Sequence, residues 1–158
     1  MSKKSEGIRP NAISYAWRRL VAKCANTYAV AELADYFSPI ELGVDVPGGC
    51  EAAVHATRRF AEHMTDNQVI EKLDLTNAFN SLQRGAMLEA VSARVPAIYK
   101  FGHLAYNQPL CLKFFKHRIM SAEGPKQGDP LGGLLLSSTI HPFSDACIQT
   151  WPKLTWMT

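Results

Sequence analysis

Apolar and polar residues recur along this chain in distinct rhythms, and each rhythm predicts a different element. Between residues 14 and 36 apolar side chains return every three or four positions, which is typical of an amphipathic helix, and Ser14 can cap its start. We expect the buried face of this helix to consist of Trp17, Leu20, Val21, Cys24 and Tyr28. The same rhythm predicts a second helix over residues 51–64, with an inner face formed by Ala53, Ala56, Phe60 and Met64.

The rhythm changes to strict alternation at residues 69–75, which predicts a strand. Val69, Leu73 and Leu75 suit a buried face, whereas Lys72 and Asp74 point the other way. We therefore expect the Asp74 carboxylate to lie outside the core, at the end of the strand and beside a polar turn. A carboxylate there is a natural ligand for a hard divalent cation, although a solvated aspartate that simply ends a strand has the same pattern.

The rest of the chain predicts further helices and a pair of strands. The helices are expected over residues 81–94 and 96–106, and the strands over residues 110–115 and 117–121. A polar glycine loop then leads into a last helix over residues 130–151, with Asp129 as its cap, Pro130 as its first residue and a bend near Pro142. Helices interleaved with strands predict an α+β fold, in which helices pack on a small, mainly antiparallel sheet.

Two polar segments carry a resemblance to a known family. DLTNAFNS, residues 74–81, ends the predicted strand, and QGDPLG, residues 127–132, opens the last helix. Together they resemble motifs A and B in the palm domain of reverse transcriptases, particularly those of non-LTR-type retroelements. GIRPNAISYAWRRLVAKCA, residues 7–25, is similar to the fingers segment of that family, and LGVDVPGGCEAAVHATR, residues 42–58, to the linker and helix before motif A.

The resemblance implies part of a right-hand polymerase. Residues 1–8 are a polar tail, residues 9–45 a partial fingers segment, and residues 46–158 a partial palm with motif A at 69–81 and motif B at 123–142. The family's thumb is missing, and so is motif C, the hairpin that supplies its other metal-binding aspartates. We therefore expect a fragment that is inactive alone, whose full-length parent would polymerise DNA on an RNA template.

The same resemblance gives roles to individual residues. Asp74 is the expected catalytic carboxylate and metal ligand, and the backbone carbonyl of Leu75 is the second metal ligand. Phe79 would lie under the sugar of the nucleotide and exclude a ribose 2′-hydroxyl, or it is a core residue that anchors the turn. Three further positions match nucleotide-binding residues of the family: Gln127, Gly128 and Arg9.

The resemblance also implies a cofactor and partners. Magnesium is the expected cofactor of the complete enzyme, and it would be held weakly here because one carboxylate and one carbonyl leave it mostly hydrated. The expected partners are an RNA template, a DNA primer and deoxynucleotides. Two other hypotheses remain: a non-enzymatic palm-derived module that binds nucleic acid or protein, and an unrelated helical interaction protein.

Composition adds little to this picture. Net charge is only +3, from 17 Lys and Arg against 14 Asp and Glu. Positive residues nevertheless cluster near the start and again at Lys113, Lys116, His117 and Arg118, which suits either a polyanion or a solvated face. The four cysteines lack zinc spacing and are expected to be reduced, buried thiols. The chain has no apolar leader and no run long enough to span a bilayer, so we expect an intracellular protein without membrane contact.

Overall fold

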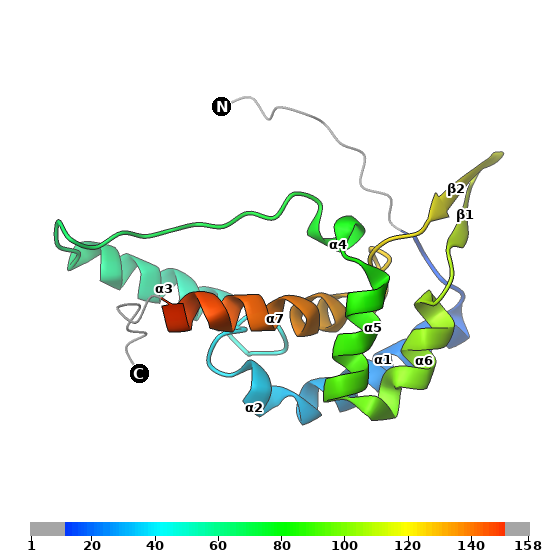
Figure 1. The fold of residues 1–158 in the computed structure, drawn as a ribbon, viewed down its shortest axis with the longest axis horizontal. Helices are drawn as coiled ribbons and strands as arrows, with labels where there is room; N and C mark the ends of the chain where they lie inside the picture. The colour runs from blue at the N-terminus through cyan, green and yellow to red at the C-terminus, as the bar shows by residue number, and fades with distance from the viewer. Residues whose placement is uncertain (1–11, 151–158) are drawn as a thin grey trace.

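The computed structural model describes residues 12–150, and the fold of these residues is α+β (Figure 1). It contains seven helices and one small antiparallel sheet of two strands. In chain order the elements are α1 (Ala16–Glu32), α2 (Ala34–Phe37), α3 (Gly49–Glu62), α4 (Ala78–Ser81), α5 (Arg84–Arg94), α6 (Pro96–Tyr106), β1 (Leu110–Phe114), β2 (His117–Ser121) and α7 (Gly132–Thr150). Within residues 12–150, no helix is both long and apolar enough to cross a membrane.

The core lies where α1, α5 and α6 surround α7. Its largest fully buried side chains are Tyr106 on α6, Met87 and Val91 on α5, and Leu134 and Leu135 on α7. The sequence defines α6 sharply, because Pro96 occupies the first turn, where its missing N–H leaves no helical bond unmade. A short turn at Val95 joins α5 to α6, so the two helices pack side by side, and α5 packs against α7 (Figure 1).

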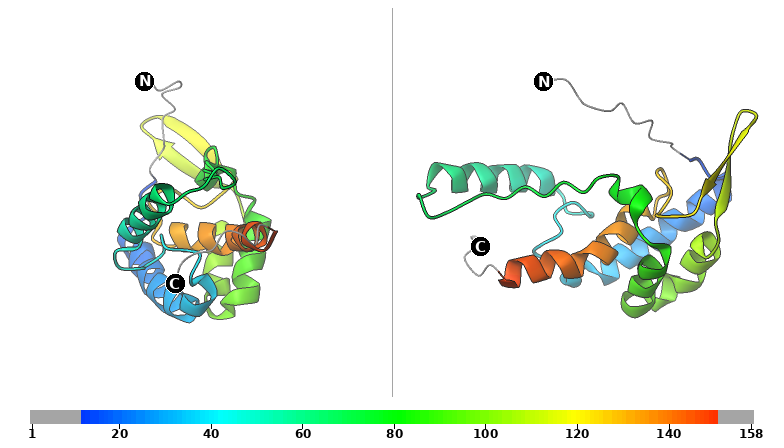
Figure 2. Two further views of the ribbon diagram at one scale, coloured as in Figure 1. Left: turned by 90° about the vertical axis from the view of Figure 1, so that its left-hand side faces the viewer. Right: turned by 45° about the horizontal axis from the view of Figure 1, so that its top comes forward.

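The two strands form a hairpin that projects beyond the helices (Figure 2, right). Its register pairs Leu110 with Ser121 at the base and Phe114 with His117 at the outer end. The turn at the tip consists of Phe115 and Lys116. The predicted pair of strands is therefore confirmed, with the first strand ending at Phe114.

The prediction for the first helix is wrong in its inner face and in its cap. Trp17 is 76% exposed, and the other large residues of the expected stripe are also exposed. The buried residues of α1 are instead Ala22, Ala29 and Val30. Small alanines let the α1 backbone approach the core closely, and this close packing outweighs the apolar pattern. Ser14 does not cap the helix; its hydroxyl accepts a hydrogen bond from Arg18 instead.

The strand predicted at residues 69–75 does not form. These residues run as an extended segment between α3 and α4, along one side of the molecule (Figure 1). The three side chains expected to be buried are exposed; Val69, for example, is 75% exposed. A strand needs a neighbouring strand for its backbone hydrogen bonds, and within residues 12–150 only β1 and β2 pair with each other.

Smaller differences concern element ends and cysteines. The predicted helix over residues 81–94 is present as α5, which begins at Arg84, and a short separate helix, α4, ends at Ser81. The last helix begins at Gly132 with Pro142 inside it. On the expected inner face of α3, Ala53 and Phe60 are half-buried and the other two residues are exposed. The cysteines are free as predicted but not buried: three are exposed, and Cys147 is half-buried.

Candidate functional site

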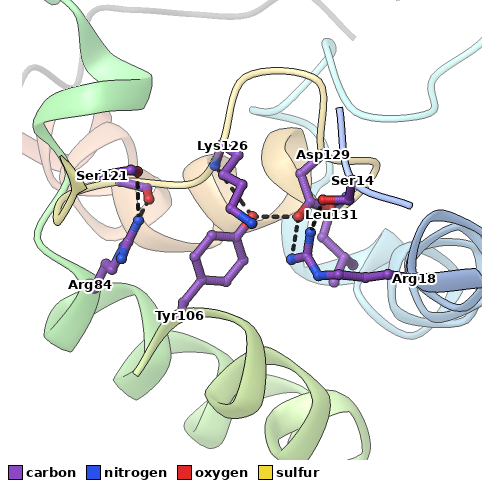
Figure 3. A network of polar contacts seen from close by, with 9 residues as sticks. Ser14, Arg18, Arg84, Tyr106, Ser121, Lys126, Asp129 and Leu131 are labelled. Atoms are coloured by element: carbon purple, nitrogen blue, oxygen red, sulfur yellow. Dashed lines mark hydrogen bonds and ion pairs between the residues drawn. The ribbon is translucent and has the colours of Figure 1, made fainter. Parts of the chain in front are cut away.

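A glycine-rich loop, residues 122–131, joins β2 to α7 and is held in place by Arg84 of α5. The Arg84 guanidinium donates to the carbonyl oxygens of Gly124 at 3.1 Å and Gln108 at 3.0 Å, and to the hydroxyl of Ser121 at 2.9 Å (Figure 3). Arg84 is buried, and in the described part of the chain it makes no ion pair. Burial lowers its pKa, but the group stays charged and fixes the loop through neutral acceptors.

The other end of the loop is held by Asp129, whose carboxylate joins three elements. It accepts hydrogen bonds from Arg18 of α1 at 2.7 Å and from the Tyr106 hydroxyl of α6 at 2.5 Å (Figure 3). It also accepts a hydrogen bond from the backbone N–H of Leu131 at 3.1 Å, within the turn that precedes α7. Asp129 was predicted to cap the last helix directly, but α7 begins three residues later, at Gly132, and the carboxylate instead holds the turn that leads into it.

Charges around this network are unbalanced toward positive. Arg18, Arg84 and Lys126 surround the single Asp129 carboxylate, and the ring of Tyr106 lies 5.7 Å from the Arg18 guanidinium carbon and 5.3 Å from that of Arg84. Burial alone would lower the pKa of Arg18, but the Asp129 carboxylate raises it overall. Burial lowers the pKa of Lys126, and the neighbouring Arg18 charge lowers it further. A negative ligand group beside Lys126 would offset this repulsion.

Beside the loop lies a cavity of about 370 Å³, a volume typical of sites for small molecules. Its walls come from the hairpin, the end of α4, the loop and the start of the described chain: Ala12, Asn80, Leu112, Ile119, Met120, Ser121, Ala122, Glu123, Lys126 and Gln127. The Oε1 atom of Gln127 is buried and, within the described residues, accepts no hydrogen bond. A buried acceptor without a donor is costly to the fold.

The end of the DLTNAFNS segment, residues 74–81, docks directly on the loop. The N–H of Gly124 donates to the carbonyl of Leu82 at 2.7 Å, and Gly124 has a φ of +58°. A β-carbon at Gly124 would overlap the carbonyl oxygen of Phe79, and one at Gly132 would lie 3.2 Å from the Phe79 ring. Glycine is therefore required at position 124 both for backbone conformation and for close approach.

The predicted site residues are brought together only in part. Gln127 lines the cavity, Gly128 lies beside it with a φ of +94°, and Phe79 is half-buried against the loop. Asp74 and Leu75 are exposed in the extended segment and are not among the residues lining the cavity. Arg9 lies outside the described residues.

The described residues do not form a complete metal site. Within residues 12–150 no group of three or more His, Cys, Asp or Glu side chains gathers in a way that could hold a metal ion. Asp74 is the lone carboxylate that the resemblance assigns to such a site. The cavity wall combines charged side chains of both signs, Lys126 and Glu123, with the amides of Gln127 and Asn80 and the apolar side chains of Leu112 and Ile119.

Four residues of this site were missed from the sequence: Arg18, Arg84, Tyr106 and Lys126. The available signal is the helical spacing of Arg18, Ala22, Ala25 and Ala29, which places the arginine in line with the small residues that pack inward. Comparison with protein families, curated proteins and solved structures finds no match to this chain. The resemblance described above therefore rests on the residues of its motifs.

Proposed function

We propose that this chain is a fragment of a reverse transcriptase from a non-LTR-type retroelement, carrying part of the fingers and palm of an RNA-directed DNA polymerase. The observation that supports the proposal most is the meeting of the two motif segments. Asn80, from motif A, and Gln127, from motif B, line one cavity, and Phe79 lies against Gly124 and Gly132. An accidental resemblance between two distant segments gives no reason for them to meet.

In this proposal each site residue takes the role that the family assigns to it. Gln127 and Gly128 would contact the incoming nucleotide, and Phe79 would lie under its sugar and exclude a ribose 2′-hydroxyl. The contact of Phe79 with Gly132 means that the same ring also anchors the turn. The two interpretations of Phe79 are compatible, because one ring face packs while another edge remains available.

The proposal includes inactivity of the chain alone. Two-metal nucleotidyl transfer requires carboxylates that span both ions, and the described residues supply one exposed carboxylate, Asp74, at the expected position. The expected Mg²⁺ site of the complete enzyme is therefore unfinished here. A non-enzymatic palm-derived module is the second candidate, and the cavity beside the loop is compatible with such a binding role.

Primer extension on an RNA template tests the proposal. We expect no extension by residues 1–158, and extension by a longer chain in which they are followed by an aspartate-bearing hairpin and a thumb. In the longer chain, Asp74→Ala should lower the rate at least about a hundredfold, because a charge-stabilising group is lost. Asp66→Ala removes another exposed aspartate from the same connecting segment and should leave the rate unchanged.

Two results would contradict the proposal. Robust deoxynucleotide incorporation by the 158-residue chain would show that its site is complete. An active longer chain that tolerates Asp74→Ala as well as Asp66→Ala would remove the motif A assignment.

Replacing Phe79 with Val in the longer chain should raise incorporation of ribonucleotides relative to deoxynucleotides. A Phe79 with a purely structural role would leave this ratio unchanged.

A further inference from the structure

The outer half of the hairpin is an exposed basic and aromatic surface. All residues from 113 to 120 are exposed, and Phe115 at the tip is 92% exposed. Phe114 and Phe115 contact each other edge to face with ring centroids 5.0 Å apart, yet neither ring is covered. Figure 2 shows the hairpin standing clear of the helices, so this surface is accessible from several sides.

The charges of the hairpin oppose its own stability. Lys113 and Arg118 are directly opposite each other across the two strands, a position where like charges destabilise a sheet. Lys116 and His117 follow at the tip, and no Asp or Glu occurs from Ala90 to Ala122. Across residues 12–150, none of these hairpin cations forms an ion pair. These charges are exposed and unpaired, and so they are accessible to a partner outside the described chain.

The tip residue is also unfavourable for the turn that it makes. Phe115 has a φ of +51°, a left-handed conformation that bulky side chains rarely adopt and that Asn or Gly would accept easily. Burial does not compensate for this strain, because the ring is exposed. Backbone strain that no packing contact compensates is found preferentially at functional positions.

We propose that the hairpin, residues 110–121, binds single-stranded nucleic acid. Lys113, Lys116 and Arg118 contact phosphates, and Phe115 stacks on a base. A polyanion matches the unpaired charges, and a strand with free base faces matches the exposed ring, since stacking with aromatic side chains is available to every base. A duplex conceals its base faces, and an acidic protein surface would leave the ring in water.

The hairpin is continuous with the cavity of the candidate site. Leu112 and Ile119 are paired across the strands and line the cavity, and Phe114 and His117 follow on the same face toward the tip. Lys113 and Arg118 point to the opposite face, so a strand that they hold would meet the cavity face only around the tip. The inference shares its class of partner with the proposed function, but it rests on an element to which that function assigns no role.

Fluorescence anisotropy with labelled oligonucleotides, about 20 nucleotides long, tests the role of the charges in the 158-residue chain. We expect Lys113→Gln/Lys116→Gln/Arg118→Gln to weaken binding at least tenfold at low salt. The slope of log affinity against log salt should fall by about 2, from three lost phosphate contacts at roughly 0.7 each. The control Arg58→Gln/Arg59→Gln/Lys72→Gln removes the same charge from exposed positions elsewhere and should change affinity less than twofold.

Phe115→Asn tests the aromatic contact while favouring the fold. Asn accepts the left-handed conformation, so the variant should melt at the same or a higher temperature while binding single strands about tenfold more weakly. Phe115→Trp should keep the affinity, because its ring also stacks. Weaker binding combined with undiminished stability separates a contact role from a structural one.

Several outcomes would overturn the inference. These are unchanged binding by the hairpin charge variant, unchanged binding by Phe115→Asn, equal affinity for a duplex of the same length, and binding to anionic lipid vesicles but not to oligonucleotides. No metal or nucleotide is added, so the result is independent of polymerase activity. An inactive longer chain with intact hairpin binding would count against the proposed function alone, and an active one with indifferent hairpin variants against this inference alone.

Discussion

Among single residues, Asp129 connects helices α1 and α6 to the loop of residues 122–131. Its carboxylate is 1% exposed and accepts from Arg18, Tyr106 and the N–H of Leu131. Hydrogen bonds to a charged group contribute about 1.5–3 kcal/mol, which is more than neutral ones contribute. Because these donors come from α1, α6 and the turn before α7, the carboxylate connects this turn to two helices.

The Tyr106 hydroxyl gives this network a measurable pH dependence. Burial, together with the Asp129 carboxylate, raises the pKa of Tyr106 well above its ordinary value of 10.0. A raised pKa in the folded state stabilises the fold fully below the unfolded value, and this contribution is lost as the pH rises toward the folded value. Tyr106→Phe should therefore lower the free energy of unfolding by about 1.5 kcal/mol at pH 7, and the difference from wild type should shrink above about pH 10.

Urea denaturation at several pH values measures this difference. Tyr28→Phe is the matched control, because Tyr28 is half-exposed and its loss should change stability by less than about 0.5 kcal/mol. A difference between wild type and Tyr106→Phe that stayed constant up to strongly alkaline pH would show that the hydroxyl ionises as freely in the folded as in the unfolded chain.

At the scale of elements, the sequence predicted those whose signals are local. The α6 boundaries follow from Pro96, the hairpin from two apolar runs around a basic turn, and the loop before α7 from Asp129. The inner face of α1 could not be predicted in this way. Its alanines and Arg18 face inward because they pack against residues that are distant in the sequence. The strand at residues 69–75 failed for a related reason, since strand formation depends on a partner elsewhere.

The same division applies to the candidate site. Gln127 and Phe79 were found because they lie within short motifs, and the structure places them at or beside one loop. Arg84 and Tyr106 carry no motif. They belong to the site because α5 packs against α7 and α6 against α5, which directs these side chains toward the loop. The positions of Arg84 and Tyr106 thus depend on tertiary packing, which the local sequence pattern does not encode.

Gly124 provides a test of how tightly the two motif segments fit. In Gly124→Ala the new β-carbon would overlap the Phe79 carbonyl, and the φ of +58° would add roughly 1–2 kcal/mol of strain. We expect a loss of at least about 2 kcal/mol in the free energy of unfolding. Gly85→Ala is the control: position 85 lies in α5 with open space around it, so alanine should raise stability by about 0.5–1 kcal/mol. Equal effects of the two substitutions in urea denaturation would contradict the docking of motif A on the loop.

At the scale of the whole molecule, the described chain divides into a packed body and a poorly covered arm. The body consists of α1, α5, α6 and α7 around the core, whereas Gly49 is the only buried residue of α3, and every residue from 61 to 77 is exposed (Figure 1). The arm carries four exposed apolar side chains: Val69, Ile70, Leu73 and Leu75. This segment is extended, apolar and unpaired, so a neighbouring strand is all that it lacks to form a β-strand.

Amide hydrogen exchange distinguishes the two parts and links them to the proposed function. Backbone amides that lack a hydrogen-bond partner exchange at rates near those of an unfolded chain, whereas core helices exchange only on larger opening. We therefore expect amides of residues 69–75 to exchange within seconds in the 158-residue chain, while those of α5 and α7 remain protected for far longer. In the longer chain that extends primers, the same segment should become protected, because under the proposed function a palm sheet would supply its neighbouring strand. Protection of residues 69–75 already in the short chain would mean that the segment is paired there, and continued rapid exchange in an active longer chain would mean that this segment works without joining a sheet.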